Sequence, residues 1–226
     1  FIAIPVVDNE DRLVGIITFD DILDVIEEEN TEDMERMGGV IDNTDKDYLD
    51  TPVLMHVKAR LPWLLVLMVS YVFTGGMIAS FEKSLSAVIA LVAYMPMLMG
   101  TGGNSGTQSS TVIITGMATG DLELSDVLRV LWKEFRIGII VGICVSILNY
   151  MRIVAFDHNG SLVALTVCLS MVLIVIIAKC IGALLPMIAK KIGIDPALIA
   201  GPMMASLTDM VALGTYFTMA RLVLKI

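Results

Sequence analysis

Apolar and polar positions divide the chain into a polar, acidic beginning and a long apolar remainder. In the first 29 residues, the β-branched runs "IAIPVV" and "LVGIIT" flank the turn-forming "DNEDR", and "TFDDILDVIEEE" follows. Ile22, Val25 and Ile26 recur at helical spacing with carboxylates between them. Residues 1–29 are therefore predicted to form a soluble β-β-α unit. Thr18 stands three residues before Asp21, which predicts a capping box at the start of the helix.

The next 31 residues, 30–60, are predicted to form an acidic linker and a juxtamembrane helix. "NTEDMERMGG" reads as a second short acidic helix that ends at Gly38-Gly39. "DTPVLMHVKARLPW" then leads into the first long apolar segment.

Residues 61–226 contain five apolar segments. Residues 61–80 and 84–117 contain no Asp, Glu, Lys or Arg, and the second would span about 50 Å as one straight helix. We therefore expect it to be broken by Pro96 and by the glycines that follow. The remaining segments cover roughly residues 137–156, 161–189 and 194–220. The pattern predicts an α-helical membrane protein with five transmembrane helices, the second of them broken.

Composition and charge support this class. The chain is 56% hydrophobic with a mean hydropathy of +0.82 and a net charge of −9, and sixteen of its 24 Asp and Glu lie between Asp8 and Asp50. Seven Lys and Arg fall on one side of the predicted membrane and four on the other. This predicts a cytosolic N-terminus and an outside C-terminus. As a separate expectation, the membrane is a bacterial inner membrane. The chain begins within an apparent strand, so we expect it to belong to a longer protein.

The segment "GTGGNSGTQSS", residues 100–110, is polar although both its flanks are apolar. Polar groups at that depth persist only inside protein or against water. Two interpretations remain open: a wet ion path, or a tight helix contact made by small residues. Asn104 and Gln108 favour the ion path, because packing alone does not require amides.

Asp209 is the one charged residue between Pro196 and Ala220. An Asp at a helix centre costs roughly 2.5–3.5 kcal/mol on the insertion scale, so it is a functional candidate, with an ion pair to Lys179 as the alternative. Carboxylate, amide and hydroxyl oxygens suit Mg²⁺, Ca²⁺ and Mn²⁺. One Asp offers little charge to a divalent ion, so we infer a symmetric homodimer with a pore on its two-fold axis.

"GTGGNSGTQSS", "DPALIAGPMMASLTD" and "EEENTEDMERMGG" together resemble the MgtE-type magnesium channels and transporters. The resemblance implies that residues 1–29 are the C-terminal half of a CBS domain and that the juxtamembrane helix is a plug. It implies Mg²⁺ at the pore residues Asp209, Ala205 and Asp195. It further implies a filter shaped by Gly100, Gly103 and Asn104, with Gln108 nearby.

The resemblance also implies regulation from the cytosol. Mg²⁺ bound by acidic residues would close the pore, and the matching positions are Asp21, Asp24, Glu29, Glu32 and Asp33. Without the resemblance, these residues read as a solvated helix face. Thr18 and Asp21 also fit a CBS pattern that holds the ribose of ATP, although a helix cap explains the same two residues.

Two functions from different classes of transport remain. The first is a Mg²⁺-selective channel that conducts hydrated Mg²⁺ into the cytosol. The alternative is a secondary transporter of Mn²⁺, Co²⁺ or Ca²⁺ coupled to H⁺ or Na⁺. An enzyme is not expected, because His56 and His158 lie at membrane edges and no nucleophile–base pair is evident.

Membrane lipid is an expected partner and nucleic acid is not.

Overall fold

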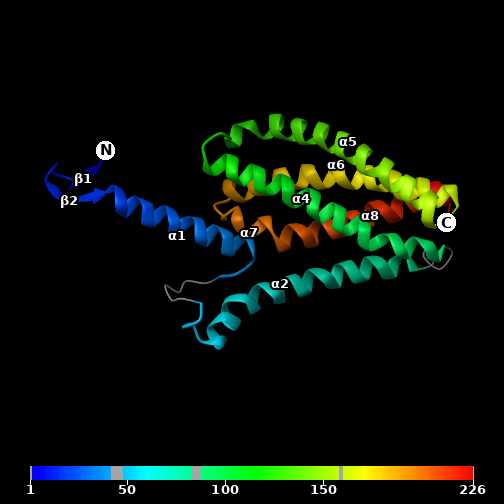
Figure 1. Cartoon of the computed structure of the whole chain (residues 1–226), viewed down its shortest axis with the longest axis horizontal. Helices are drawn as coiled ribbons and strands as arrows, with labels where there is room; N and C mark the ends of the chain where they lie inside the picture. The colour runs from blue at the N-terminus through cyan, green and yellow to red at the C-terminus, as the bar shows by residue number, and fades with distance from the viewer. Residues whose placement is uncertain (1, 42–47, 83–87, 158–159, 226) are drawn as a thin grey trace.

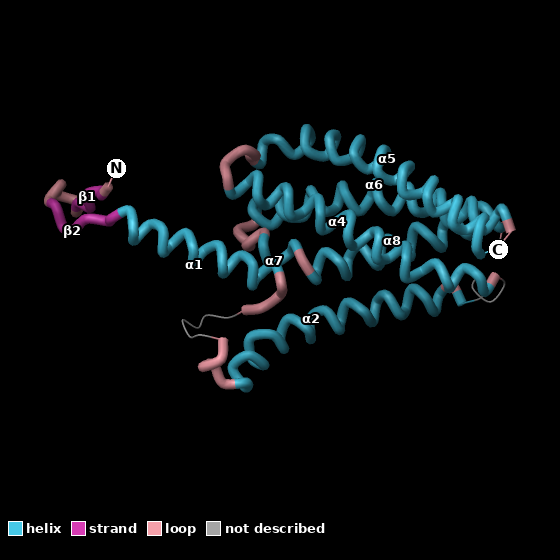
Figure 2. Tube along the Cα trace, in the orientation of Figure 1, coloured by secondary structure: helices cyan, strands magenta, loops and turns pink. Residues whose placement is uncertain are grey.

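The computed structural model describes residues 2–41, 48–82, 88–157 and 160–225. The protein is elongated and mostly helical (Figure 1; Figure 2), with the N-terminal strands at one end and the C-terminus at the other. A hydrophobic helical bundle makes up the body, and one long helix connects it to the strands.

The N-terminal unit is a hairpin followed by a helix, as the sequence predicts. Strands β1 (Ala3–Val7) and β2 (Leu13–Thr18) pair antiparallel, and α1 (Phe19–Met37) follows at once. The Thr18 side chain and backbone both bond the Asp21 carboxylate, at 2.6 and 2.7 Å, which confirms the capping box.

Helix α1 is continuous, so the prediction of two acidic helices is wrong. Asn30 and Thr31 lie inside it. The Thr31 hydroxyl donates to the carbonyl oxygen of Glu27 at 2.9 Å, so it bonds within the helix and does not start a new one.

The juxtamembrane segment and the first apolar segment also form one helix, α2 (Val53–Ser80), which crosses the predicted boundary at residue 60. Pro62 lies inside α2, where its ring removes one backbone donor. Figure 1 shows α2 along the edge of the bundle beside α8, and most of its apolar side chains are exposed. Its outer face therefore suits contact with lipid.

The second apolar segment is broken before Pro96, and the glycine run does not contribute to the break. A 3₁₀ turn, η1 (Ile89–Tyr94), leads into α4 (Met95–Ala118). Pro96 sits in the first turn of α4, where no backbone N–H is needed. Residues 100–110 are all helical, so the expectation of unwound backbone there is wrong.

The last three apolar segments form long helices. The 3₁₀ turn η2 (Leu124–Asp126) precedes α5 (Val127–Arg152), which begins ten residues earlier than predicted, and η3 (Ile153–Asp157) is a π-helical end. Then follow α6 (Ser161–Lys191), the short α7 (Ala197–Ala200) and α8 (Pro202–Leu224). The fifth segment is therefore interrupted at Gly201, a break that the sequence analysis did not predict.

Within the described residues, four regions are long and apolar enough to cross a membrane: α2, residues 124–157, α6 and α8. Helix α4 has 24 residues, about 36 Å at 1.5 Å per residue, but its polar stretch makes it less hydrophobic. A fifth span therefore stays a prediction.

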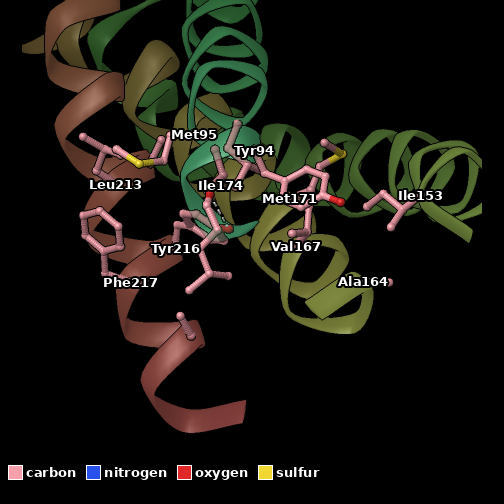
Figure 3. Close-up of a cluster of buried hydrophobic side chains, with 14 residues drawn as sticks. Tyr94, Met95, Ile153, Ala164, Val167, Met171, Ile174, Leu213, Tyr216 and Phe217 are labelled. Carbon is pink, nitrogen blue, oxygen red and sulfur yellow. Dashed lines mark hydrogen bonds between the residues drawn. The ribbon is translucent and has the colours of Figure 1, made fainter. Parts of the chain in front are cut away.

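One large apolar cluster holds the bundle together near its C-terminal end (Figure 3). Tyr216 and Phe217 of α8 pack there with Met171 of α6. The Tyr216 hydroxyl donates to the carbonyl oxygen of Leu91 at 3.0 Å. This cluster fixes α4 and α8 side by side, with the polar stretch of α4 further along the bundle.

Candidate functional site

Helix α4 approaches α6 and α8 through glycines that leave little room for a side chain. A Cβ atom built on Gly106 would lie 2.9 Å from Cγ2 of Thr208 and 3.4 Å from the carbonyl oxygen of Ala178. A Cβ on Gly103 would lie 3.9 Å from Cα of Ala205. The predicted filter residue Gly103 and the predicted pore residue Ala205 are thus brought together.

The backbones of α4 and α6 meet even more closely. A Cβ built on Gly182 of α6 would lie 2.2 Å from the carbonyl oxygen of Gly106. Gly100 differs, because nothing lies within 4 Å of a Cβ built there. The glycines of the polar stretch therefore serve helix contact at some positions and leave open space at another.

Asp209 is partly buried on α8, one position after Thr208. The Thr208 hydroxyl bonds back to the carbonyl oxygens of Met204 and Ala205, at 2.8 and 2.9 Å. In the part of the chain that the structure describes, no donor or cation pairs with the Asp209 carboxylate. The predicted alternative, an ion pair between Asp209 and Lys179, is not formed.

Asn104 and Gln108 lie on an exposed face of α4, four residues apart. Both line a cavity of about 950 Å³ between α4, α5 and α6. Charged residues of the two other helices also line this cavity: Lys133 and Glu134 from α5, and Lys179 from α6.

Glu134 is a candidate that the sequence analysis missed. It is buried in α5 and accepts a hydrogen bond of 2.6 Å from the hydroxyl of Ser109 on α4. Lys179 is also buried, and its Nζ lies 3.4 Å from the same hydroxyl oxygen. Glu134 belongs to a stripe of buried residues that recurs every four positions along α5: Val130, Glu134, Gly138, Gly142 and Ser146. The small residues Gly138, Gly142 and Ser146 at this spacing were the signal in the sequence, because small residues four apart are typical of helix contacts in membranes.

Asp195 lies at the junction between the bundle and α1. One carboxylate oxygen accepts the backbone N–H of Ala197 at 2.9 Å, and the other accepts from Arg36 of α1 at 2.5 Å. Arg36 also pairs with Glu32. Burial and the nearby Asp195 raise the pKa of Asp33. Of the predicted regulatory residues, Glu32 and Asp33 are thus placed near a predicted pore residue.

The other predicted regulatory residues lie elsewhere on α1. Asp24 and Glu29 are exposed, and Asp21 caps the helix start, where bonds from Thr18 lower the pKa of its carboxyl group. Among the described residues, no three His, Cys, Asp or Glu side chains are grouped closely enough to hold a metal ion. The structure therefore does not gather the predicted acidic set into one cluster.

Two family models match this chain, one in its N-terminal unit and one in the helical bundle. The model of the MgtE divalent cation transporters matches residues 95–219, more than half of the chain, and the CBS-domain model matches residues 2–28. Proteins named "Magnesium transporter MgtE" are similar along almost the whole chain. The one from Thermus thermophilus is 43% identical over 225 residues, which is 100% of this chain and 49% of the relative.

Two further relatives carry the same name. The protein from Bacillus subtilis is 37% identical over 221 residues, covering 97% of this chain and 48% of the relative. The protein from Enterococcus faecalis is 31% identical over 225 residues, covering 100% and 49%. The chain thus spans about half the length of these relatives.

A bundle of long apolar helices with charged side chains buried inside it is typical of an integral membrane protein of the transporter class. The chain belongs to the MgtE family of divalent cation transporters.

Proposed function

We propose that two copies of this chain form a homodimer that conducts hydrated Mg²⁺ into the cytosol along α4 and α8. The carrying observation is the close contact of these helices through Gly103 and Ala205, which sets the polar stretch beside the turn that bears Asp209. The relatives named as magnesium transporters support Mg²⁺ as the substrate.

Asp209 is the residue that would meet the ion. Its carboxylate has no cation or donor among the described residues, so its charge is available to an ion in the path. Mg²⁺ dehydrates reluctantly and usually keeps several waters. Two Asp209 carboxylates on a two-fold axis would balance its charge through that water shell.

Arg36, Glu32 and Asp33 support control from the cytosolic side. They lie at the contact of α1 with Asp195, so divalent ions bound there would change how α1 holds the bundle. We propose that cytosolic Mg²⁺ acts in this way to close the path. ATP bound at Thr18 and Asp21 stays a prediction, since the capping box already employs both side chains.

The test is Mg²⁺ flux into liposomes that contain the chain or its Asp209→Asn variant. We expect Asp209→Asn to lower flux at least about tenfold, which corresponds to 1.4 kcal/mol, while size-exclusion still reports a dimer. Asp121→Asn, at an exposed loop position, is the matched control and should conduct like the original chain. Undiminished flux in Asp209→Asn would refute the path along α8.

The same liposomes separate a channel from a coupled transporter. A channel predicts Mg²⁺ entry that follows the Mg²⁺ gradient and is unchanged when a pH or Na⁺ gradient is imposed. Flux that requires either gradient would instead support the coupled transporter.

A further inference from the structure

The cavity between α4, α5 and α6 contains two buried side chains of opposite charge that the proposed path does not use. Glu134 is 8% exposed and Lys179 is 5% exposed. Both line the cavity, which also reaches the amides of Asn104 and Gln108. The charges of Glu134 and Lys179 therefore act on the exposed face of α4 that bears Asn104 and Gln108.

Lys179 is buried in the bundle, well before the C-terminal end of α6. It precedes Lys191 at the end of α6 by 12 residues, about 18 Å along the axis. Its ammonium group must therefore find compensation inside the protein. Glu134 supplies it through Ser109, whose hydroxyl lies between the two charges at 2.6 Å from the carboxylate and 3.4 Å from Nζ.

Glu134 and Lys179 both keep hydrogen-bonding capacity that no described protein group uses. Lys179 has three donors, and the only hydrogen bond from its Nζ to a described group is the one of 3.4 Å to Ser109. The bond from Ser109 reaches a single oxygen of Glu134, Oε2. The second carboxylate oxygen and the amides across the cavity are ligands of the type that a hydrated divalent ion binds.

We propose that Lys179 is a resident cation that keeps Glu134 from binding the transported divalent ion. Without Lys179, the Glu134 carboxylate would have no buried cation beside it among the described residues, since Lys133 is exposed, and it would retain Mg²⁺ in the cavity. With Lys179 in place, the pair is neutral and the ion passes without a second tight site. This inference deepens the proposed function, because it assumes that divalent ions reach the face of Asn104 and Gln108.

The first test measures Mn²⁺ binding by electron paramagnetic resonance in an Asp209→Asn background, so that the proposed site at Asp209 does not contribute. Adding Lys179→Met should create one new Mn²⁺ site per chain, at least tenfold tighter than any site in the background, and Mg²⁺ should displace the Mn²⁺. Adding Glu134→Gln as well should remove the new site. Lys191→Met, an exposed lysine of the same helix, should leave binding unchanged.

Lys179→Met leaves a buried unpaired carboxylate, so its folding is part of the test. We expect monodisperse protein when the variant is extracted in millimolar MgCl₂ and loss of it in EDTA. The double variant Lys179→Met/Glu134→Gln should fold in both. Rescue by acidic buffer but not by MgCl₂ would show that a proton neutralises Glu134, and it would overturn the proposal.

The second test separates this inference from the proposed function. With Asp209 intact, Lys179→Met should slow Mg²⁺ flux at least about threefold, and Lys179→Met/Glu134→Gln should restore it. No new Mn²⁺ site in Lys179→Met would refute the resident-cation role and leave the path at Asp209 untouched. Loss of flux in Asp209→Asn tests that path alone.

Discussion

Gly201 and Met37 are in direct backbone contact, although 164 positions separate them in the sequence. A Cβ atom built on Gly201 would lie 1.9 Å from the carbonyl oxygen of Met37. The last turn of α1 therefore rests on the interruption between α7 and α8. The ion pair between Arg36 and Asp195 holds the same junction.

Gly201→Ala should push the end of α1 away from the bundle, because neither backbone can yield to a methyl group 1.9 Å from an oxygen. We expect faster amide hydrogen exchange over residues 36–41 and weaker inhibition of flux by cytosolic Mg²⁺. Gly75→Ala on α2, where a Cβ meets nothing within 4 Å, should change neither. Unchanged exchange in Gly201→Ala would show that α1 does not depend on this contact.

Gly182→Ala should destabilise the bundle itself. The added methyl would lie 2.2 Å from the carbonyl oxygen of Gly106, and overpacking of this kind typically costs about 1–3 kcal/mol. Thermal unfolding in detergent should show a lower Tm. Gly214→Ala is the matched control, since its Cβ would meet the flexible Met77 side chain at 3.6 Å, and its Tm should stay close to that of the original chain.

Asp33 should make the junction sensitive to pH. Burial and Asp195 raise the pKa of Asp33 in the folded chain. The folded chain therefore binds a proton at Asp33 more tightly than the unfolded chain does. The stabilisation by the bound proton is full below the ordinary value of 3.8. It is lost as the pH rises through the raised pKa. Asp33→Asn imitates the protonated form at every pH.

We therefore expect Asp33→Asn to raise the Tm at pH 7 by up to about 3 °C and to have no effect on the Tm at a pH below 3.8. Asp24→Asn provides the control, because Asp24 is exposed on the same helix, about 18 Å from Arg36. A lower Tm for Asp33→Asn at pH 7 would contradict the direction of the pKa shift.

The sequence predicts where α1 begins, but it does not predict that α1 runs unbroken to Met37. The Thr18–Asp21 capping box depends on residues three apart, so the sequence alone is enough to predict it. Asn30 and Thr31 are residues that often cap the start of a helix. Here the Thr31 hydroxyl donates to the carbonyl oxygen of Glu27 in the preceding turn, so the helix continues through both residues.

The polar stretch of α4 shows where tertiary packing decides. Four glycines in eleven residues favour unwound backbone by propensity alone. The segment is nevertheless helical, because Gly102 and Gly106 let α4 lie directly against α6 and α8. Contacts between distant helices are not visible in one sequence.

The candidate site was predicted in part. The family resemblance named Gly103 and Ala205, and the structure brings these two residues together, while their role in ion transport stays a prediction. Glu134 was missed because the third span was expected to begin at residue 137, which left this acid outside the membrane. Its four-residue spacing with Gly138 and Gly142 was the sign that α5 begins earlier.

The unbroken course of α1 makes it a lever. Nineteen residues at 1.5 Å each give a rigid arm of about 28 Å, with the β-hairpin at one end and Gly201 as the pivot at the other. A tilt of about 10° would move the hairpin by about 5 Å while the pivot turns in place. A displacement of the β-hairpin would thus be transmitted through α1 to the interruption between α7 and α8, eight residues before Asp209.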